Sequence, residues 1–529
     1  MTSIHDILTR AVGLHQAGEP GQAAALYRSV LAIAPDQSDA LHLLGLLIRR
    51  DRLQDGVTLM ARALVLFPTL PAALFNLANA LIDQGRLDEA AAHFRRKLEL
   101  DPDCGMTLSR LGSDALACGR IDEAERWFRR TVAVDGMSSR LHYALERCVT
   151  ARALRDDAAD PSLPPGLVVR GVFRDSSGYA YKVRRLVRHL VEAGVRVRLV
   201  DLNYGDTDNL PDDQIDPLLR TLDQPVRARA VLTITTPPAV EAIPGLKTIN
   251  FTMFEAAGIP ALWAGHSRRH DQVIVATESS RTAWLGAGHP ADRIHVCPEG
   301  VETVAASGVA PAAIVDSAGR RLSDHRVRVL NVSDLNSRKN LAGLLRVWLR
   351  TTRPEDSAGL MLKVGKGGGI AGSIREMLAG ASAETGRTLA QAAPVFLVEG
   401  KLSDAEMMSL HASSTHYWSM SHGEGWDLPM AQAGAMGLTL LAPDHSAYCA
   451  YLDDRVAHMI PCRVTPASGG YRGQDWWTPD EDAAARLLRA VIDDPDGTRR
   501  SAQRHLLDHF SWPQAAQRLI ALLTEMDAL

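Results

Sequence analysis

The amino-acid sequence opens with about four repeats of close to 34 residues, and no other feature restricts the possible fold as strongly. The clearest pair is residues 85–90 followed by Phe94, and residues 119–124 followed by Phe128. A repeat of this length is a pair of helices that cannot bury its apolar face alone, so successive pairs must stack. Residues 4–137 are therefore predicted to form an all-α superhelix with a concave binding surface.

Small and aromatic residues recur where stacked helices would touch. Small side chains stand at Ala23, Gly56, Ala90 and Ala124, and aromatic side chains at Tyr27, Phe94 and Phe128. The pattern resembles the tetratricopeptide repeat, with glycines at 45 and 112 in the first helices and prolines at 35, 68 and 102 closing the second. The resemblance implies recognition of a protein partner or acceptor, and a rigid spacer or dimerisation arm is the alternative. With a capping helix, this domain is predicted to span residues 1–154.

A polar, proline-rich stretch at residues 155–166 is predicted to be a linker. After it, residues 167–173 have the composition of a buried strand, 175–180 form a glycine-containing loop, and 182–193 are amphipathic. A second strand is predicted at 195–201. This order indicates a right-handed parallel crossover, with a loop where open α/β sheets bind ligands.

The α/β pattern then occurs twice. Strands are predicted at residues 230–234, 247–252, 272–276, 327–332, 360–364 and 395–398, with a helix at 340–350. The economical interpretation is an α/β fold of two Rossmann-like, doubly wound domains, at residues 167–320 and 321–529. A ligand cleft is expected between their facing strand ends.

Composition excludes several classes of protein. Hydrophobic residues make up 46% and charged residues 23%, an ordinary globular balance, and the net charge of −4 lacks the basic excess of a nucleic-acid partner. The six cysteines form neither a CxxC pair nor a metal-ligand spacing. The first residues lack the basic segment followed by an apolar run that is typical of a signal peptide, and no uninterrupted apolar run of about 18 residues occurs in the sequence. We expect a soluble cytoplasmic protein without a transmembrane segment, a metal or another cofactor.

The segment 421–432 contains the residues that most clearly indicate a ligand-binding site. Gly423 and Gly425 flank Glu424, which predicts close backbone approach to a ligand and positive φ at the glycines. Pro429 suits the first turn of a helix, whose N-terminal N–H groups and dipole attract phosphate. The segment therefore predicts a site for a sugar hydroxyl and a diphosphate, although a simple capping turn would have a similar sequence.

Three segments together resemble family 4 of the retaining glycosyltransferases, which have the GT-B architecture of two Rossmann-like domains. They are residues 250–301, residues 333–340 and the segment around Glu424, and the resemblance covers roughly residues 167–525. It implies a nucleotide-sugar donor, transfer with retention by front-face substitution, and no metal.

The resemblance also implies residue roles. Glu424 would contact donor-sugar hydroxyls, and Arg338 and Lys339 would neutralise charge on the departing diphosphate. These three are the catalytic candidates. The donor-binding candidates are Ser333, Gly423, Gly425, Trp426, Gln432 and Gly178, and the acceptor-side candidates are Glu255 and Tyr179.

Three positions depart from the family pattern. Gln432 replaces the second glutamate, which would hold the nucleoside ribose, and an amide offers one acceptor and one donor where a carboxylate offers only acceptors. Asp427 replaces a glycine, and Asp334 stands where many relatives carry arginine. These substitutions motivate the alternative of a weak or inactive glycosyltransferase-like scaffold whose repeats bind a protein.

Two further expectations concern packing. His422 is expected to be a structural hydrogen-bonder. Trp476, Trp477 and Trp512 are expected to belong to terminal helices that brace the first α/β half.

Overall fold

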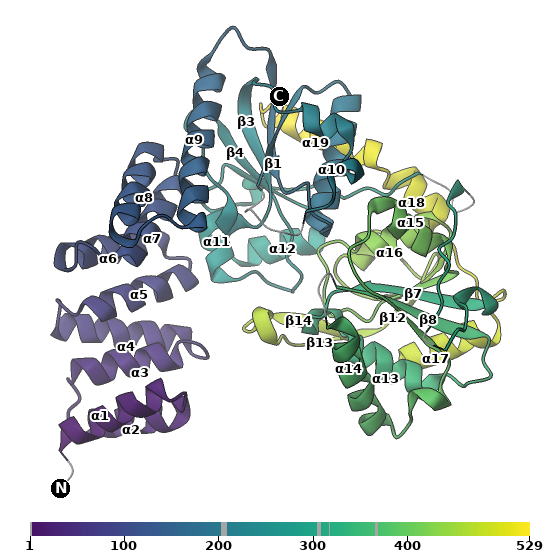
Figure 1. Cartoon of the computed structure of the whole chain (residues 1–529), viewed down its shortest axis with the longest axis horizontal. Helices are drawn as coiled ribbons and strands as arrows, with labels where there is room; N and C mark the ends of the chain where they lie inside the picture. The colour runs from purple at the N-terminus through teal and green to yellow at the C-terminus, as the bar shows by residue number, and fades with distance from the viewer. Residues whose placement is uncertain (1–2, 203–208, 304–307, 317, 366–368) are drawn as a thin grey trace. The chain divides into compact units, whose positions relative to one another are not determined.

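The computed structural model describes residues 3–202, 209–303, 308–316, 318–365 and 369–529 (Figure 1). The chain divides into two compact units. The first comprises Met1–Asp156, Pro237–Leu246 and Ala261–His270, and the second comprises Asp157–Thr236, Lys247–Pro260 and Asp271–Leu529.

The first unit is a stack of helices, in which each helix from α1 to α7 packs against the next one along the chain (Figure 1). The helices are α1 (Ile4–Gln16), α2 (Pro20–Ile33), α3 (Ser38–Ile48), α4 (Leu53–Leu66), α5 (Pro71–Asp83), α6 (Leu87–Leu100), α7 (Gly105–Ala117), α8 (Ile121–Asp135) and α9 (Ser139–Ala159). The predicted superhelix of tetratricopeptide repeats is confirmed.

Small residues allow the repeat helices to approach closely. A Cβ atom on Gly45 would lie 2.8 Å from the carbonyl oxygen of Gly56, and one on Gly112 would lie 2.6 Å from the ring of Phe128. Both contacts are shorter than a real side chain permits. The recurring glycine and aromatic positions are therefore packing requirements of the helix pairs.

The connection between repeats and sheets is shorter than the sequence predicts. Helix α9 continues to Ala159, and strand β1 begins at Pro165. Residues 155–159 combine arginine, aspartate and alanine, which a solvated last helical turn accepts, and Pro161 prevents the helix from continuing. Only residues 160–164 of the predicted linker are neither helix nor strand.

Two later segments of the chain belong to the first unit, and one of them contains helix α11 (Ala261–Ser267). A Cβ atom on Gly85 would lie 2.1 Å from the carbonyl oxygen of Ala261, so the α5–α6 turn touches α11 backbone to backbone. Arg269 adds ion pairs to Asp88 at 2.6 Å and Asp114 at 2.8 Å. The repeats and these two segments are thus packed together within one compact unit.

The second unit contains two parallel six-stranded sheets within the described residues, in the orders β2-β1-β3-β4-β5-β6 and β12-β11-β10-β7-β8-β9. The first comprises β1 (Pro165–Gly171), β2 (Val197–Asp201), β3 (Arg227–Ile234), β4 (Lys247–Phe251), β5 (Gln272–Val275) and β6 (Ile294–Val296). The second comprises β7 (Val327–Ser333), β8 (Ala358–Val364), β9 (Val395–Val398), β10 (His416–Trp418), β11 (Thr439–Pro443) and β12 (His458–Ile460). The predicted GT-B architecture is confirmed.

Helices accompany both sheets (Figure 1). They are α10 (Gly178–Glu192), α12 (Glu278–Gly286), α13 (Leu341–Thr351), α14 (Ile370–Thr385), α15 (Asp404–Ala412), α16 (Leu428–Ala435), α17 (Glu481–Asp493), α18 (Gln503–His509) and α19 (Trp512–Glu525). Helix α19 packs against α10, and Trp512, 1% exposed, belongs to the core of the first half. The expected bracing role of Trp512 is confirmed.

The packing role expected for Trp476 and Trp477 agrees with the structure, but their expected place on a terminal helix is wrong, because both lie on a hairpin. Strands β13 (Cys462–Pro466) and β14 (Asp475–Pro479) pair antiparallel, and the two tryptophans are on β14. Trp476 stacks on His422 with ring centroids 4.5 Å apart, and Trp477 stacks on His445 at 5.1 Å. These aromatic stacks hold the hairpin against the loop that carries Glu424.

A buried ion pair lies inside the first half. Lys182 on α10 and Glu299 after β6 are 2.8 Å apart and at most 1% exposed, and the Lys182 Nζ lies 3.2 Å from the centroid of the Phe251 ring. Burial lowers the pKa of Lys182 and raises that of Glu299. Each charge is tolerated in this core because the other is present.

Replacing Lys182 by Met should lower the free energy of unfolding by about 3–5 kcal/mol, because Glu299 would then be buried without a partner. The double variant Lys182→Met with Glu299→Leu should recover most of this loss. Urea denaturation of both, with the exposed Arg188→Met on the same helix as the control, measures the effect. A double variant no more stable than the single one would contradict the expectation.

Candidate active site

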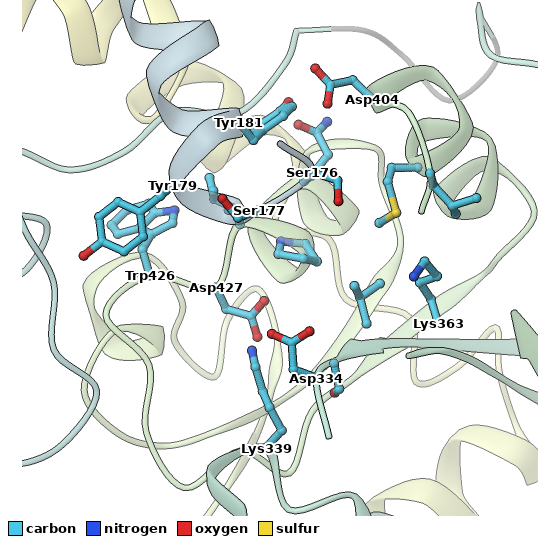
Figure 2. Close-up of a pocket in the computed structure, with 18 of the residues that line it drawn as sticks. Ser176, Ser177, Tyr179, Tyr181, Asp334, Lys339, Lys363, Asp404, Trp426 and Asp427 are labelled. Carbon is cyan, nitrogen blue, oxygen red and sulfur yellow. The ribbon is translucent and has the colours of Figure 1, made fainter. Parts of the chain in front are cut away.

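A cavity of about 410 Å³ lies between the two halves of the second unit (Figure 2). The first half lines it with the β1–α10 loop and with Met253 and Glu255 after β4. The second half contributes the turn after β7, the ends of β8 and β9, helix α15 and the loop into α16. The cavity is therefore built at the carboxyl ends of strands from both sheets, as the sequence predicts.

Glu424 is the most tightly bound charge in this cavity. Its carboxylate is 5% exposed and lies 2.6 Å from Nη1 of Arg338 and 2.7 Å from Nζ of Lys339. Arg338 is itself buried and also approaches Glu255, with Nη2 3.7 Å from Oε1. The structure thus brings the three catalytic candidates together.

This arrangement fixes the ionisation of Glu424. Burial alone would raise its pKa, but the charges of Arg338 and Lys339 lower the pKa to about 2. The folded-state pKa is therefore below the ordinary value of 4.5, and the stabilisation is present above that value and lost as the pH falls toward 2. At neutral pH Glu424 accepts hydrogen bonds and cannot act as a general acid.

Two loops position the charges by bonding to each other. The backbone oxygen of Arg338 accepts hydrogen bonds from the N–H of His422 at 2.7 Å and from the hydroxyl of Ser421 at 3.2 Å. Asn340 adopts the left-handed conformation with φ 49° and caps α13, which turns the chain sharply after Lys339. His422 also lies 3.2 Å from the Trp477 carbonyl through Nδ1, in agreement with the expected structural role.

The two glycines beside Glu424 act differently from the prediction. Neither Gly423 nor Gly425 has positive φ. A Cβ on Gly423 would instead lie 2.1 Å from the carbonyl oxygen of Glu255, and one on Gly425 would lie 2.6 Å from the Cβ of Met253. Both glycines are needed because a loop of the first half crosses directly over the Glu424 loop.

Asp427 caps helix α16 and reduces its capacity to bind phosphate. Its carboxylate accepts the Met430 N–H at 3.2 Å and the Tyr448 hydroxyl at 2.8 Å. Because Pro429 has no N–H, two of the first three helical positions cannot donate to a phosphate. Burial raises the pKa of Asp427, and the charge of Glu424 raises it further.

The lining of the cavity is balanced in charge. Five basic side chains (Arg184, Arg338, Lys339, Lys363 and Lys401) face five acidic ones (Glu255, Asp334, Asp404, Glu424 and Asp427). Figure 2 shows Asp334, Lys339 and Asp427 turned toward one another. A diphosphate in this cavity would meet the Asp427 charge beside Lys339, so its affinity should depend on the protonation of that aspartate.

The remaining donor-side candidates all lie near this cavity. Gly178, Trp426 and Gln432 line it, and Trp426 packs its indole ring 4.7 Å from the ring of Tyr451. Ser333 also lines it and donates its hydroxyl to Asn331 Oδ1 at 2.6 Å. Their roles in binding a donor stay predictions.

On the acceptor side, Glu255 and Tyr179 both line the cavity. Tyr471 donates its hydroxyl to Glu255 Oε2 at 2.9 Å, and the Tyr179 hydroxyl accepts the N–H of Met253 at 3.3 Å. Tyr471 lies in the β13–β14 hairpin, which sequence reasoning did not identify. No local pattern marks it, because the contact joins residues 216 positions apart.

Sequence reasoning also missed a polar contact across the cavity. Arg184 on α10 lies 2.7 Å from Asp404 at the start of α15, and Arg184 also donates to the carbonyl oxygens of Phe173 and Asp175. The side chain of Lys363 is another missed component of the lining. The only available signal was the arginine pair at 184 and 185 on an amphipathic helix.

Comparison with known proteins supports the assignment of the repeats. The family model described as tetratricopeptide repeat matches residues 71–104 and a second such model matches residues 105–130. No curated protein gives a significant match to the sequence.

Several solved structures are similar at low identity. A mutant of the Thermobaculum terrenum O-GlcNAc transferase is 14% identical, covering 99% of this chain and 98% of that one with a TM-score of 0.38. The sucrose-phosphate synthase of Thermosynechococcus elongatus is 14% identical, covering 69% and 99% with a TM-score of 0.47. TarM is 13% identical, with a TM-score of 0.40, and the match covers 55% of this chain. The chain spans only about half of TarM's length, 54%. None of these values is high enough to transfer an activity.

The part of the chain that the structure describes contains neither a metal-binding cluster nor a membrane-spanning helix. No three His, Cys, Asp or Glu side chains in that part of the chain are grouped to hold a metal ion. No helix there combines the length and apolar character needed to cross a bilayer.

The variant Asp427→Asn should bind nucleoside diphosphates more tightly, by roughly tenfold at pH 8, because it removes one buried negative charge and keeps the cap. The gain should shrink as the pH falls, since the raised pKa of Asp427 lets the wild type lose the same charge. Calorimetric titration with uridine, guanosine, adenosine and cytidine diphosphates from pH 5.5 to 8.5 measures this. Asp223→Asn on the surface is the control, and equal affinity of Asp427→Asn and the wild type at pH 8 would contradict the expectation.

Proposed function

We propose that this protein is a glycosyltransferase that moves a sugar from a nucleotide-sugar donor to an acceptor. One observation carries the proposal: an ionised, buried glutamate is held between an arginine and a lysine at the carboxyl ends of two facing parallel sheets. A carboxylate in such a place can accept hydrogen bonds from sugar hydroxyls, and the two cations can meet a diphosphate. The resemblance of three segments to family 4 of the retaining glycosyltransferases supports the same function.

The proposed reaction retains the anomeric configuration. The bond from the sugar C1 to the diphosphate oxygen breaks while a bond from C1 to the acceptor oxygen forms on the same face, and the acceptor proton passes to the departing phosphate. Arg338 and Lys339 stabilise the charge that develops on the diphosphate, and Glu424 orients the sugar. No residue of the chain needs to act as a nucleophile, and no metal is required.

Glu424→Gln should reduce sugar transfer about 100-fold or more, because the amide cannot balance Arg338 and Lys339 or accept the same hydrogen bonds. The measurement is transfer of labelled sugar from the donor that calorimetry identifies, with product configuration read by proton NMR. Glu376→Gln, at an exposed position of α14, is the matched control. Undiminished transfer by a folded Glu424→Gln protein would refute the proposed site, and an inverted product would refute retention.

A second candidate is a scaffold that binds a nucleotide sugar, or no ligand, without turnover. The charge balance of the cavity and the capping of α16 by Asp427 favour it, because both reduce the attraction for a diphosphate. Sugar transfer by the wild type that is lost in Glu424→Gln would exclude this candidate.

We further propose that the acceptor is a protein held by the repeats. A cavity of about 290 Å³ lies between α5, α7, α8 and α9, and its lining combines the apolar Phe75, Met106 and Leu141 with two arginines, Arg110 and Arg140, and one carboxylate, Asp135. Burial and the charge of Arg140 lower the pKa of Arg110. Two neighbouring guanidinium groups beside apolar surface suit an acidic and partly apolar segment of a protein.

Deleting the repeats would be a poor test of this role. Glu241, in a segment that belongs to the first unit, is 1% exposed and is paired with Arg147 of α9. Truncation would leave that buried carboxylate without its partner and would unfold more than the repeats.

Replacing Arg110 and Arg140 by Glu should instead reduce labelling of acceptor protein at least tenfold, because the charge of the cavity is reversed. Hydrolysis of the donor in water should be unchanged. The exposed Arg95→Glu on α6 serves as the control. Equal labelling of acceptor protein by the double variant and the wild type would contradict the proposal that this cavity recruits the acceptor.

A further inference from the structure

Residues 300–303 lead out of the first half of the second unit toward the second half, and they are hydrogen-bonded to residues of both halves. The chain leaves the first half through Gly300 and Val301 and returns to it at Trp512. The Val301 N–H donates to the Phe510 carbonyl at 2.7 Å, and the Trp512 N–H donates to the Val301 carbonyl at 3.3 Å. A Cβ atom on Gly300 would lie 2.5 Å from Trp512, so the two crossings touch directly.

The next residue, Glu302, is held by a side chain and not by a strand. Its N–H donates to Oε1 of Gln432 at 2.8 Å, and its carbonyl accepts from Nε2 of the same amide at 3.4 Å. Gln432 is 7% exposed and lies on α16, five residues after Asp427. A single amide thus satisfies both backbone groups of Glu302, as a neighbouring strand would.

The side chain of Glu302 points to the first half. The Tyr181 hydroxyl donates to Oε1 at 3.2 Å, and Nε of Arg185 lies 2.7 Å from the same oxygen. Arg185 also lies 3.4 Å from Asp404 of α15. Glu302 is therefore bound through its backbone to α16 of the second half and through its side chain to α10 of the first.

We propose that Gln432 is a positioning residue that fastens the connecting segment, residues 300–303, to helix α16 and so sets the separation of the two halves around the cavity. The inference deepens the proposed function, since α16 begins at the end of the Glu424 loop. Gln432 is suited to this because the backbone of one residue presents one donor and one acceptor, and the uncharged side-chain amide offers one of each in return.

A glutamate at position 432 would match only half of this pattern. Its carboxylate could accept the Glu302 N–H but would face the Glu302 carbonyl with a second acceptor, and it would add a negative charge beside the Glu302 backbone, in a cavity whose lining already includes Asp404. The basic group nearby, Arg185, is already paired with the Glu302 and Asp404 carboxylates. Once protonated, the introduced carboxyl would again offer one donor and one acceptor.

The test is hydrogen exchange, followed by mass spectrometry, of peptides that cover residues 296–303, in Gln432→Glu and the wild type compared at the same pH. At pH 8 exchange in the variant should be at least tenfold faster. At pH 5 it should return to within about twofold of the wild type, because burial raises the pKa of the introduced carboxyl. Gln432→Met should exchange faster at both pH values, and the exposed Gln214→Glu at neither.

The outcomes separate this proposal from other roles of Gln432. Wild-type exchange in Gln432→Glu at pH 8 would overturn it, and so would faster exchange that persists at pH 5 in a folded variant. Tighter binding of nucleoside diphosphates by Gln432→Glu, with exchange unchanged, would instead assign Gln432 to the ribose. Because exchange needs no nucleotide, failure of the wild type to bind one would count against the proposed function and leave this test intact.

Discussion

Burial of the Glu424 carboxylate is the constraint on which the cleft depends. An ionised carboxylate that is 5% exposed is stable only beside cations, and here both cations come from the turn that follows β7. The turn and the Glu424 loop must therefore form together. Because Gly423 and Gly425 allow residues 253–255 to pack directly on the Glu424 loop, the same charge cluster also draws a loop of the first half into the site. A local electrostatic requirement thus determines how segments from both sheets meet.

The sequence alone predicts those helices and strands whose apolar residues recur with a regular period. The 34-residue repeat and the alternation of strands and helices could be predicted from the residues themselves. The grouping of Arg338 and Lys339 with Glu424, which lies 85 positions after Lys339, was implied only by the resemblance to the retaining glycosyltransferases. The β13–β14 hairpin could not be predicted, because its tryptophans are apolar residues whose partners, His422 and His445, are set by tertiary packing. Nor could the Arg184–Asp404 contact, which joins residues 220 positions apart. The glycines beside Glu424 were identified correctly but for the wrong reason, since backbone crowding and not positive φ requires them.

Two of the three positions that differ from the glycosyltransferase pattern, Asp427 and Gln432, are hydrogen-bonded in the structure. Asp427 caps α16 and accepts the Tyr448 hydroxyl, and Gln432 satisfies both backbone groups of Glu302. Buried polar groups without partners would destabilise the fold by about 1–3 kcal/mol each, and these two have partners. Asp427 and Gln432 therefore belong to a consistent hydrogen-bonded framework around the cavity, whatever ligand the cavity holds. Asp427 differs from Gln432 in being ionisable, and its negative charge would lower the affinity of the cavity for a diphosphate.

The path of the chain relates the repeats to the cleft more closely than a terminal linker would. Strand β4 ends at Phe251, and α11, which belongs to the first unit, begins at Ala261. The short stretch between them contains Met253 and Glu255, which line the cavity. Arg269, two residues after the end of α11, is paired with Asp88 and Asp114 of the repeats. The loop that packs on the Glu424 loop is therefore continuous in sequence, over fewer than ten residues, with a helix that belongs to the same compact unit as the repeats.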